Sequence, residues 1–257
     1  KSLWTENQAG EPVKFIESFD EKNEAEIICQ DIKKLILSGF SPKDFAIFYR
    51  MNAQSRSIET ALRNFNVDYE IVGGTEFYQR AEIKDILAYL RILVNENDDI
   101  ALSRIINVPT RGLGKKGFEE IANFAETKSI SIWRAMQNEE ALSGLSERTK
   151  KSVNQFVNMM LSFKNKKYPS TSKCVEDVLS KTGYLAYIKK KDAKKDEDRE
   201  ANVEEFMASV IEYENQFPDV SLAGFLERTS LISSVDKLKD KNEQKVTLMT
   251  LPSANVF

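Results

Sequence analysis

The hydrophobic pattern of the chain changes near residue 80 and again near residue 245. Before the first change, short apolar runs indicate strands. Residues 45–49 (Phe-Ala-Ile-Phe-Tyr) form a nearly continuous apolar run, and residues 69–72 are of the same type. Residues 13–16 alternate less cleanly and are also expected to form a strand.

Two helix-spaced segments lie between these runs. Asn23 is in position to cap a helix that ends at Leu37, with Gly39 following, and a second helix is expected over residues 54–65. Each segment has an apolar face, made by Ala25, Ile28, Ile32, Leu35 and Ile36 in the first and by Ile58, Ala61, Leu62 and Phe65 in the second. Strands that alternate with helices predict a parallel α/β portion.

From Glu82 to about Asn242 the spacing is helical throughout. The clearest apolar stripes are Ile83, Ile86, Leu87, Leu90 and Leu93; then Phe118, Ile121, Ala122, Phe124 and Ala125; then Val153, Phe156, Val157, Met160 and Phe163. Aromatic and methionine residues at this spacing are expected in a core and not around a cofactor. Strand character returns at residues 246–250. The pattern predicts a mainly helical chain, in which a large all-α domain is inserted into an α/β portion.

One stretch inside the helical block is strongly charged. Residues 189–205 carry two lysine clusters and then the acidic run 196–198, with few apolar positions before Val203. This composition favours a solvated loop that leads into a helix.

A turn rich in glycine and proline separates two helical segments at residues 107–117 (Asn-Val-Pro-Thr-Arg-Gly-Leu-Gly-Lys-Lys-Gly). At a helix N-terminus, such a loop can present backbone N–H groups and positive charge to a phosphate. Compact turns of this kind contact the backbone of nucleic acids. The turn therefore points towards DNA.

Two other interpretations of the turn compete with that one. Gly112, Gly114 and Gly117 have the spacing of a dinucleotide-binding fingerprint, which requires a preceding strand. The preceding residues 99–106 have helical spacing instead, so this interpretation fails on context. The remaining alternative is a plain connection between helices, in which the glycines serve backbone conformation only.

Composition limits how such a chain could hold DNA. Its 257 residues are 41% hydrophobic, enough for one large core or two modest ones. The 37 basic and 40 acidic side chains leave a formal charge of −3. Any contact with nucleic acid must therefore be a local patch, and binding by the chain alone should be weak.

Several classes of chemistry are excluded by what the sequence lacks. It has no histidine, which removes serine-histidine and cysteine-histidine catalysis, and it has no Gly-x-x-x-x-Gly-Lys-Ser/Thr phosphate loop. Cys29 and Cys174 are far apart, so neither a zinc site nor a disulfide framework is expected. We assign no catalytic residue and no metal site. With no signal peptide and no apolar run of about 20 residues, the expectation is a soluble, cytoplasmic protein without membrane contact.

Five stretches together resemble the UvrD/Rep/PcrA-like superfamily 1 DNA helicases. They are residues 1–5 (Lys-Ser-Leu-Trp-Thr), 48–56 (Phe-Tyr-Arg-Met-Asn-Ala-Gln-Ser-Arg), 72–78 (Val-Gly-Gly-Thr-Glu-Phe-Tyr), 82–91 (Glu-Ile-Lys-Asp-Ile-Leu-Ala-Tyr-Leu-Arg) and the turn. They occur in the family's order and cover nearly the whole chain.

The resemblance implies a division into domains. Residues 1–78 would be part of the RecA-like motor domain 2A, residues 79–243 the helical insertion 2B, and residues 244–257 the return into 2A. Family members bind ATP and Mg between domain 2A and a domain 1A, which carries the phosphate loop. We therefore expect no cofactor in this chain itself, and ATP and Mg in a longer helicase of which it is a fragment.

The resemblance also assigns candidate DNA contacts. The family's Gly-Ile-Gly turn, which contacts duplex phosphates, falls on Gly112-Leu113-Gly114. We add Thr110, Arg111, Lys115 and Lys116 because of their charge and their position at the next helix N-terminus. These contacts would position a duplex without reading its sequence.

Arg50 and Asn52 align with 2A positions that touch the single strand in the family. Each of the two residues could instead have a purely structural role. Asn52 could cap the following helix, and Arg50 could pair with a carboxylate. Arg80 and Lys84 could add to the basic surface, although a solvated helix face is the simpler account.

The end of the chain departs from the family. A His-x-x-Lys-Gly motif should follow Leu251, but residues 252–256 are Pro-Ser-Ala-Asn-Val. We interpret this as truncation, in preference to a joined sequence or a degenerate motif.

Three functions are consistent with these features. The first is part of an ATP-dependent 3′-to-5′ DNA helicase of repair or replication that engages a junction of duplex and single strand. The second is a regulatory module that binds protein regulators and rotates about a hinge at Gly73 and Gly74. The third is a helicase-like part of a nuclease complex without activity of its own.

Overall fold

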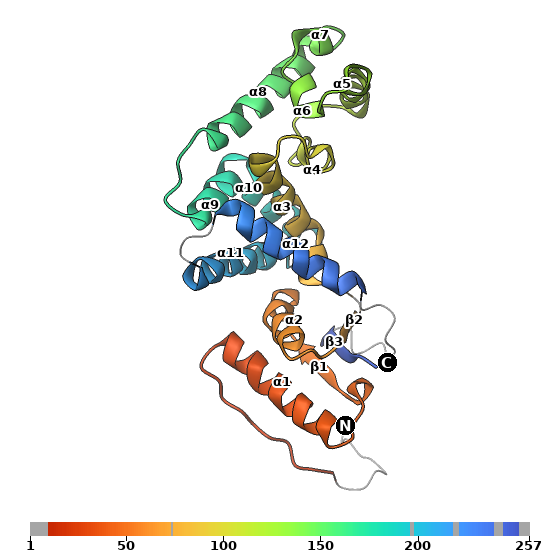
Figure 1. Ribbon diagram of the computed structural model, residues 1–257, viewed down its shortest axis with the longest axis vertical. Coiled ribbons are helices and arrows are strands. Elements are labelled where there is room, and N and C mark those ends of the chain that lie inside the picture. The colour runs from red at the N-terminus through yellow and green to blue at the C-terminus, as the bar shows by residue number, and fades with distance from the viewer. Residues whose placement is uncertain (1–9, 73, 196–197, 218–220, 239–243, 252–257) are drawn as a thin grey trace.

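The computed structural model describes residues 10–72, 74–195, 198–217, 221–238 and 244–251. Its shape is elongated, with a small α/β portion at one end and helices forming the rest (Figure 1). The α/β portion contains α1 (Glu21–Leu37), η1 (Pro42–Asp44), β1 (Ala46–Tyr49), η2 (Asn52–Gln54), α2 (Ser55–Asn64), β2 (Tyr69–Val72) and β3 (Val246–Thr250).

Strand β3 occupies the centre of a three-stranded parallel sheet in the order β1-β3-β2. Leu248 lies opposite Ile47 of β1 and opposite Ile71 of β2. A strand from the far end of the chain therefore joins two strands that precede the helical block. This confirms the predicted combination of a mainly helical chain with a parallel α/β portion.

Helices α1 and α2 contribute with the sheet to one hydrophobic core. Cys29 and Leu62 are fully buried there together with Leu248. Helix α1 begins at Glu21, because the Asp20 side chain accepts the Asn23 N–H at 2.7 Å. The predicted cap at Asn23 is therefore wrong by three positions, and Asp20 is the capping residue.

The predicted strand at residues 13–16 is absent: these residues belong to no helix or strand. Val13 and Phe15 are fully exposed. A strand needs a neighbour to satisfy its backbone groups, and alternation in the sequence cannot supply one.

The helical portion contains η3 (Phe77–Gln79), α3 (Ala81–Val94), α4 (Asp99–Ile105), α5 (Lys115–Lys128), α6 (Ile132–Ala135), α7 (Glu139–Leu142), α8 (Glu147–Lys164), α9 (Thr171–Lys181), α10 (Tyr184–Lys195), α11 (Arg199–Gln216) and α12 (Leu222–Leu238). Several N-termini are capped by a side chain of their own N-cap residue: Asp98 in α4, Ser146 in α8 and Ser170 in α9. Helices α5 to α8 form the end farthest from the sheet (Figure 1).

A second hydrophobic core fills this portion. The predicted stripes converge in it, with Ile83, Ile121, Phe156 and Met160 almost fully buried. The expectation that these aromatic and methionine positions form a core is confirmed.

The prediction of a solvated loop from residue 189 is wrong for its first part, because α10 continues through Lys195. Tyr184 and Ile188 anchor this helix in the core. Lys189 forms an ion pair with Glu200 at 2.7 Å, and Lys191 stacks on the Tyr187 ring. Lysine has good helix propensity. A helix that is anchored upstream by buried side chains can therefore continue through the charged run. No helix in the described part of the chain is long and apolar enough to cross a membrane.

Candidate nucleic-acid interface

The predicted DNA-binding turn connects α4 to α5. Gly112 has a positive φ of 82°, a conformation that favours glycine, and Gly114 is the N-cap of α5. No side chain caps this helix. The first backbone N–H groups of α5 therefore remain open to an external acceptor, next to Lys115 and Lys116.

Arg111 is turned into the protein. Its guanidinium donates to the carbonyl oxygens of Ile105 and Pro109, at 3.0 and 3.2 Å, and to the Tyr89 hydroxyl. It also lies 5.2 Å from the centroid of the Phe156 ring. These contacts make Arg111 the residue that fixes the shape of the turn. Its role as a direct DNA contact stays a prediction.

Gly117 lies close to α8, and Leu113 packs beside Gly117. The Leu113 side chain is buried, and a Cβ added to Gly117 would lie 3.2 Å from Thr149 Cγ2. Because only a glycine fits this approach without displacement, α5 and α8 can meet closely at their N-terminal ends. The sequence prediction treated Gly117 as part of a motif, and the structure gives it a packing role.

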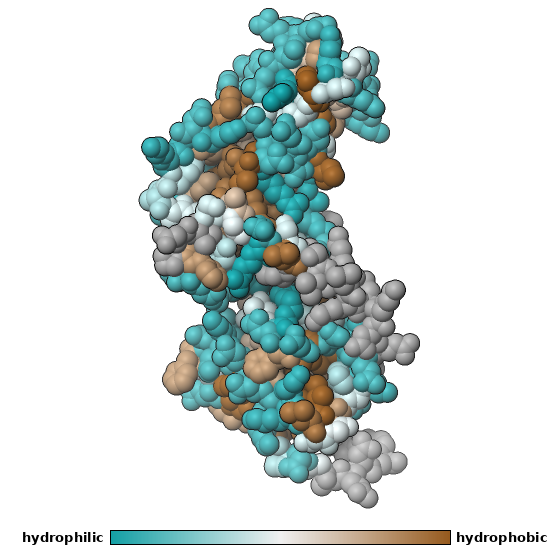
Figure 2. Space-filling view, in the orientation of Figure 1, coloured by the Kyte–Doolittle hydropathy of each residue, from teal (hydrophilic) through white to brown (hydrophobic). Residues whose placement is uncertain are grey.

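Exposed basic groups flank the turn, with the carboxylates of Glu119 and Glu147 also exposed nearby. Thr110, Lys115 and Lys116 are exposed, and the Lys115 side chain is 91% accessible with only a 3.7 Å contact to Glu119. Among the described residues Lys116 has no ion-pair partner. Figure 2 shows hydrophilic residues over most of this end of the molecule.

Helix α8 adds Arg148 and Lys151, which the sequence prediction missed. Both are exposed, and their helix is close to the turn, since Ser152 Oγ would lie 3.7 Å from a Cβ on Gly112. The signal was present as basic residues just before the apolar stripe that starts at Val153. We call Lys115, Lys116, Arg148 and Lys151 the basic end.

Arg50 and Asn52 lie where β1 ends. Arg50 is exposed, and its backbone N–H donates to Gln54 Oε1 at 3.0 Å. Gln54 closes this turn, so the suggested capping role of Asn52 is wrong. Within the described residues neither the Arg50 guanidinium nor the Asn52 amide has a hydrogen-bond or ion-pair partner. Both remain available to a ligand, and their contact with a single strand stays a prediction.

Arg80 does not contribute to a basic surface, because it is 6% exposed. Its guanidinium donates to Asn202 Oδ1 at 2.7 Å and to Ser55 Oγ at 2.6 Å. It thus links α2 to α11. Lys84 is half-buried on α3.

We call the contact between the α/β portion and the helical portion, where α2 meets η3 and α11, the joint. Glu59 is the central hydrogen-bond acceptor in this joint. Its fully buried carboxylate accepts from Ser55 Oγ at 2.6 Å, from the Phe77 N–H at 3.2 Å and from the Tyr69 hydroxyl at 3.3 Å. Arg63 lies 3.8 Å away. Burial raises the pKa of Glu59, against the opposing effects of Arg63, Ser55, Arg80 and the Phe77 N–H.

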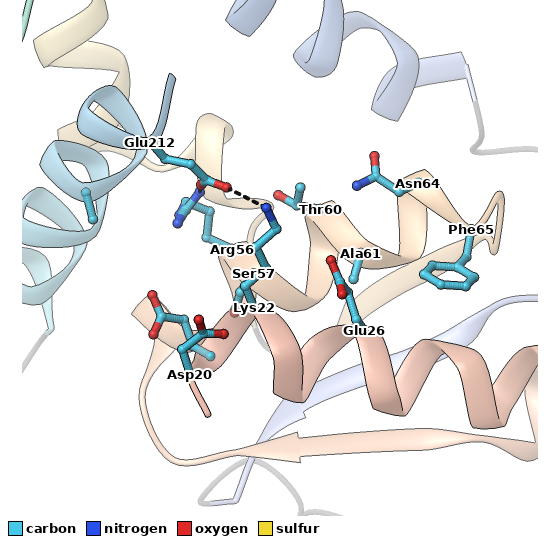
Figure 3. Close-up of a pocket in the computed structure, with 12 residues that line it drawn as sticks. Asp20, Lys22, Glu26, Arg56, Ser57, Thr60, Ala61, Asn64, Phe65 and Glu212 are labelled. Atoms are coloured by element: carbon cyan, nitrogen blue, oxygen red, sulfur yellow. Dashed lines mark hydrogen bonds and ion pairs between the residues drawn. The ribbon is translucent and has the colours of Figure 1, made fainter. Parts of the chain in front are cut away.

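Ion pairs close the outer side of the same joint. Arg56 on α2 binds Glu205 and Glu212 of α11, the latter at 3.2 Å. Lys22 of α1 also lies 3.5 Å from Glu212, and Figure 3 shows these two side chains pointing towards one another. They border a cavity of about 450 Å³ between α1, α2 and α11. The joint between the two portions is therefore polar and charged.

The predicted hinge is only partly visible, because Gly73 lies outside the described residues. Gly74 has no left-handed φ, and a Cβ there would lie 3.1 Å from Ile71 Cγ2. Close packing therefore explains Gly74, and its role as a hinge stays a prediction.

The fold and this basic end define a class of chain in which a parallel α/β layer is interrupted by a long helical insertion. The chain belongs to the family of the UvrD-like helicase C-terminal domain, whose family model matches residues 1–255. It is thus related to the C-terminal region of the PcrA/UvrD ATP-dependent DNA helicases.

Curated relatives agree with this membership. The chain is 39% identical over 257 residues to the ATP-dependent DNA helicase PcrA of Staphylococcus aureus strain Mu50. It is 38% identical to the protein of the same name from Staphylococcus epidermidis strain RP62A. Each match covers 99% of this chain and 35% of the relative, so the chain spans about a third of the relatives' length.

Some features of the predicted resemblance cannot be described structurally. Residues 1–5 and the altered segment 252–256 lie outside the described residues. Within the described residues no group of three or more histidine, cysteine, aspartate or glutamate side chains could hold a metal ion.

Proposed function

We propose that this chain is the DNA-engaging C-terminal part of an ATP-dependent DNA helicase that moves 3′ to 5′ on one strand. Its family and the name of its relatives support this proposal. The observation that carries it is the basic end, where four exposed cations surround an uncapped helix N-terminus. Such a surface binds phosphates without reading bases.

The proposal assigns residues 1–78 and 244–257 to a RecA-like motor domain and residues 79–243 to a duplex-binding insertion. The return of β3 into the sheet supports this division. The separate hydrophobic cores of the two portions support it as well. In the longer protein, ATP and Mg would bind between this motor domain and a second one that carries the phosphate loop. Closure of the two motor domains on ATP would pull DNA past the insertion.

Within the insertion, Lys115, Lys116 and the N–H groups of Gly112 to Gly114 contact duplex phosphates. Arg148 and Lys151 extend the contact along α8. Arg111 and Leu113 hold the turn in the shape that presents these groups. Arg50 and Asn52 contact the single strand at the sheet.

This proposal can be tested with a DNA hairpin that has a 3′ tail. Fluorescence would measure its binding to the chain at several salt concentrations. If the four cations of the basic end each neutralise a phosphate, log K should fall with log salt with a slope of about −3 to −4. A blunt hairpin should retain most of this slope. Absence of binding, or a slope near zero, would show that the basic end does not hold DNA.

A second role, control of the orientation of the insertion, is favoured by the charged joint. Arg56, Glu205 and Glu212 fix α2 against α11 by ion pairs that would have to break if the helical portion rotated. Glu212 is 37% exposed, so its ion pair with Arg56 can exchange with water more readily than an apolar interface can open. The joint would then act as a latch between two orientations.

Removal of the latch charges should broaden the distribution of orientations. We expect one population in fluorescence energy transfer between dyes at Lys34→Cys and Asn123→Cys, and a broader or second population after Glu205→Gln with Glu212→Gln. Burial raises the pKa of Cys29 to about 12 and that of Cys174 to about 11, so these thiols should label slowly. Glu126→Gln with Glu139→Gln, far from the joint, is the matched control. An unchanged distribution in the joint variant would exclude the latch.

A further inference from the structure

The hydroxyl group of Tyr89 joins helix α3 to the DNA-binding turn. Helix α3 extends from the joint towards α4, which precedes the turn (Figure 1). Tyr89 is fully buried, and its hydroxyl donates a hydrogen bond to the Val108 carbonyl oxygen and accepts one from Arg111 Nη2. A phenol has one proton to donate, so its donor and an acceptor position are both used by groups of the turn. The two bonds therefore hold the turn at its base, at residues 108 and 111.

Tyr89 also helps to orient the Arg111 guanidinium. Its Cζ atom packs on two rings, 5.7 Å from the Tyr89 centroid and 5.2 Å from that of Phe156. Other hydrogen-bond acceptors of the guanidinium are carbonyl oxygens, which include those of Pro109 at 3.2 Å and Thr182 at 3.4 Å. Among the described residues no carboxylate forms an ion pair with it. Its position therefore depends on neutral oxygens and aromatic faces, and Tyr89 supplies one of each.

The backbone groups proposed to bind phosphate follow Arg111 directly. The Arg111 N–H donates to Asn107 Oδ1 at 2.7 Å, so the turn is closed across residues 107–111. The chain then passes through the positive φ of Gly112 and begins α5 after the uncapped Gly114. Glycine restricts the backbone little, so the direction of these N–H groups depends on what holds the turn on either side. A turn that is held in advance loses less conformational entropy when it binds.

Tyr89 is itself held in place by its neighbours. The Tyr184 ring meets it edge-on, with the centroids 6.2 Å apart, and the Tyr184 hydroxyl donates to Asp85 Oδ2 at 3.0 Å, one helical turn before Tyr89 on α3. Burial raises the pKa of Tyr89 to about 12, against the opposing effect of Arg111, so the hydroxyl keeps its proton at neutral pH. A phenylalanine ring would fill the same space in the core. Packing therefore accounts for the ring and leaves the hydroxyl to the turn.

We propose that Tyr89 is a positioning residue for duplex binding: through Val108 and Arg111, its hydroxyl holds the turn in the shape whose backbone N–H groups meet a phosphate. This rests on the proposed function, because duplex binding by the turn is itself proposed. It adds a buried residue that touches no DNA and still sets the affinity for it. The charge of the basic end and the shape of the turn are then separate contributions to binding.

Tyr89→Phe tests the proposal by removing one oxygen atom and keeping the ring. The turn loses two of its hydrogen bonds, so binding of a blunt DNA hairpin should weaken about fivefold to tenfold. Because the four cations of the basic end are unchanged, the slope of log K against log salt should stay that of the wild-type chain. A general loss of structure at this end would make the slope shallower as well.

Tyr69→Phe is the matched control, because the Tyr69 hydroxyl makes the same kind of contacts in the other portion of the molecule. It is buried in the joint, where it accepts a hydrogen bond from Arg63 Nη1 at 2.6 Å and donates one to Glu59 at 3.3 Å. This variant should leave hairpin binding unchanged. Binding is measured well below the thermal midpoint of each variant, so that a loss of stability alone does not reduce it. Arg111→Lys, which retains the charge but cannot satisfy several oxygens at once, should reproduce the weaker binding with the unchanged slope.

The outcomes separate the two proposals. Wild-type affinity in Tyr89→Phe or in Arg111→Lys overturns the positioning role and leaves the proposed function standing. An equal loss in Tyr69→Phe, or a shallower slope in Tyr89→Phe, also overturns it, since the cause would then be general destabilisation. If the wild-type chain does not bind the hairpin at all, the proposed function itself fails.

Discussion

Reversing the charge of Lys115 and Lys116 to glutamate should weaken binding of a blunt DNA hairpin on the order of 100-fold at low salt. Two cations at the N-terminus of an uncapped helix would become anions. Both the phosphate contacts and the positive local potential would therefore be lost. The slope of log K against log salt should also become shallower by about 2, because two fewer counterions are released.

Folding should survive this change. The Lys115 side chain is 91% exposed, and its contact with Glu119 is a surface pair worth less than about 0.5 kcal/mol. Glutamates in the first turn of a helix interact favourably with its dipole, so the melting temperature should stay the same or rise slightly. Lys14→Glu with Lys43→Glu changes the total charge equally on the α/β portion and serves as the control. If that control weakened duplex binding as much as the double variant at the turn, the effect would be one of net charge, and the turn would not be the site.

Replacing Glu59 by alanine should lower the free energy of unfolding by about 3 kcal/mol. The change leaves Arg63, the Ser55 and Tyr69 hydroxyls and the Phe77 N–H without their shared acceptor in a buried joint. Urea denaturation followed by circular dichroism measures the loss. Glu126→Ala, on the exposed face of α5, should change stability by less than about 0.5 kcal/mol.

The contribution of Glu59 to the free energy of unfolding should change with pH in one direction. Burial raises the pKa of Glu59 in the folded state. A raised folded pKa means that the contribution of Glu59 to stability is largest below its unfolded pKa of about 4.3, and is lost as the pH rises through the folded value. Compared with Glu59→Gln, which cannot titrate, the wild-type chain should therefore gain relative stability as the pH falls from neutral towards the unfolded pKa of Glu59. The opposite trend, or a loss under about 1 kcal/mol for the alanine variant, would remove Glu59 from the centre of the joint.

Sequence patterns predicted the long helices well, because their apolar stripes are long, although the capping residues suggested at Asn23 and Asn52 were wrong. The stripes around Ile83, Ile121 and Phe156 all face one core. The strand at residues 13–16 was wrong because pairing depends on a neighbour elsewhere in the chain. The helix over Lys189–Lys195 was missed because tertiary anchors at Tyr184 and Ile188 outweigh a polar composition.

Charge alone could not show which basic residues face solvent. Arg80 and Arg111 look like Lys115 and Lys116 in the sequence, yet both guanidinium groups are held by internal acceptors. A planar guanidinium can satisfy several carbonyl and hydroxyl oxygens at once, whereas a lysine usually extends into water. Arg148 and Lys151 were missed for the converse reason, since only the fold brings α8 beside the turn.

The central position of β3 has a consequence for biosynthesis. Strands β1 and β2 cannot complete their sheet until residues 246–250 leave the ribosome, long after residue 72. At ~5–20 residues per second, the delay is on the order of ten to thirty seconds. During that interval the helical portion can condense around its own core, while α1 and α2 expose the apolar faces that the sheet later covers. The nascent α/β portion is thus the part of the chain on which a chaperone would be expected to act.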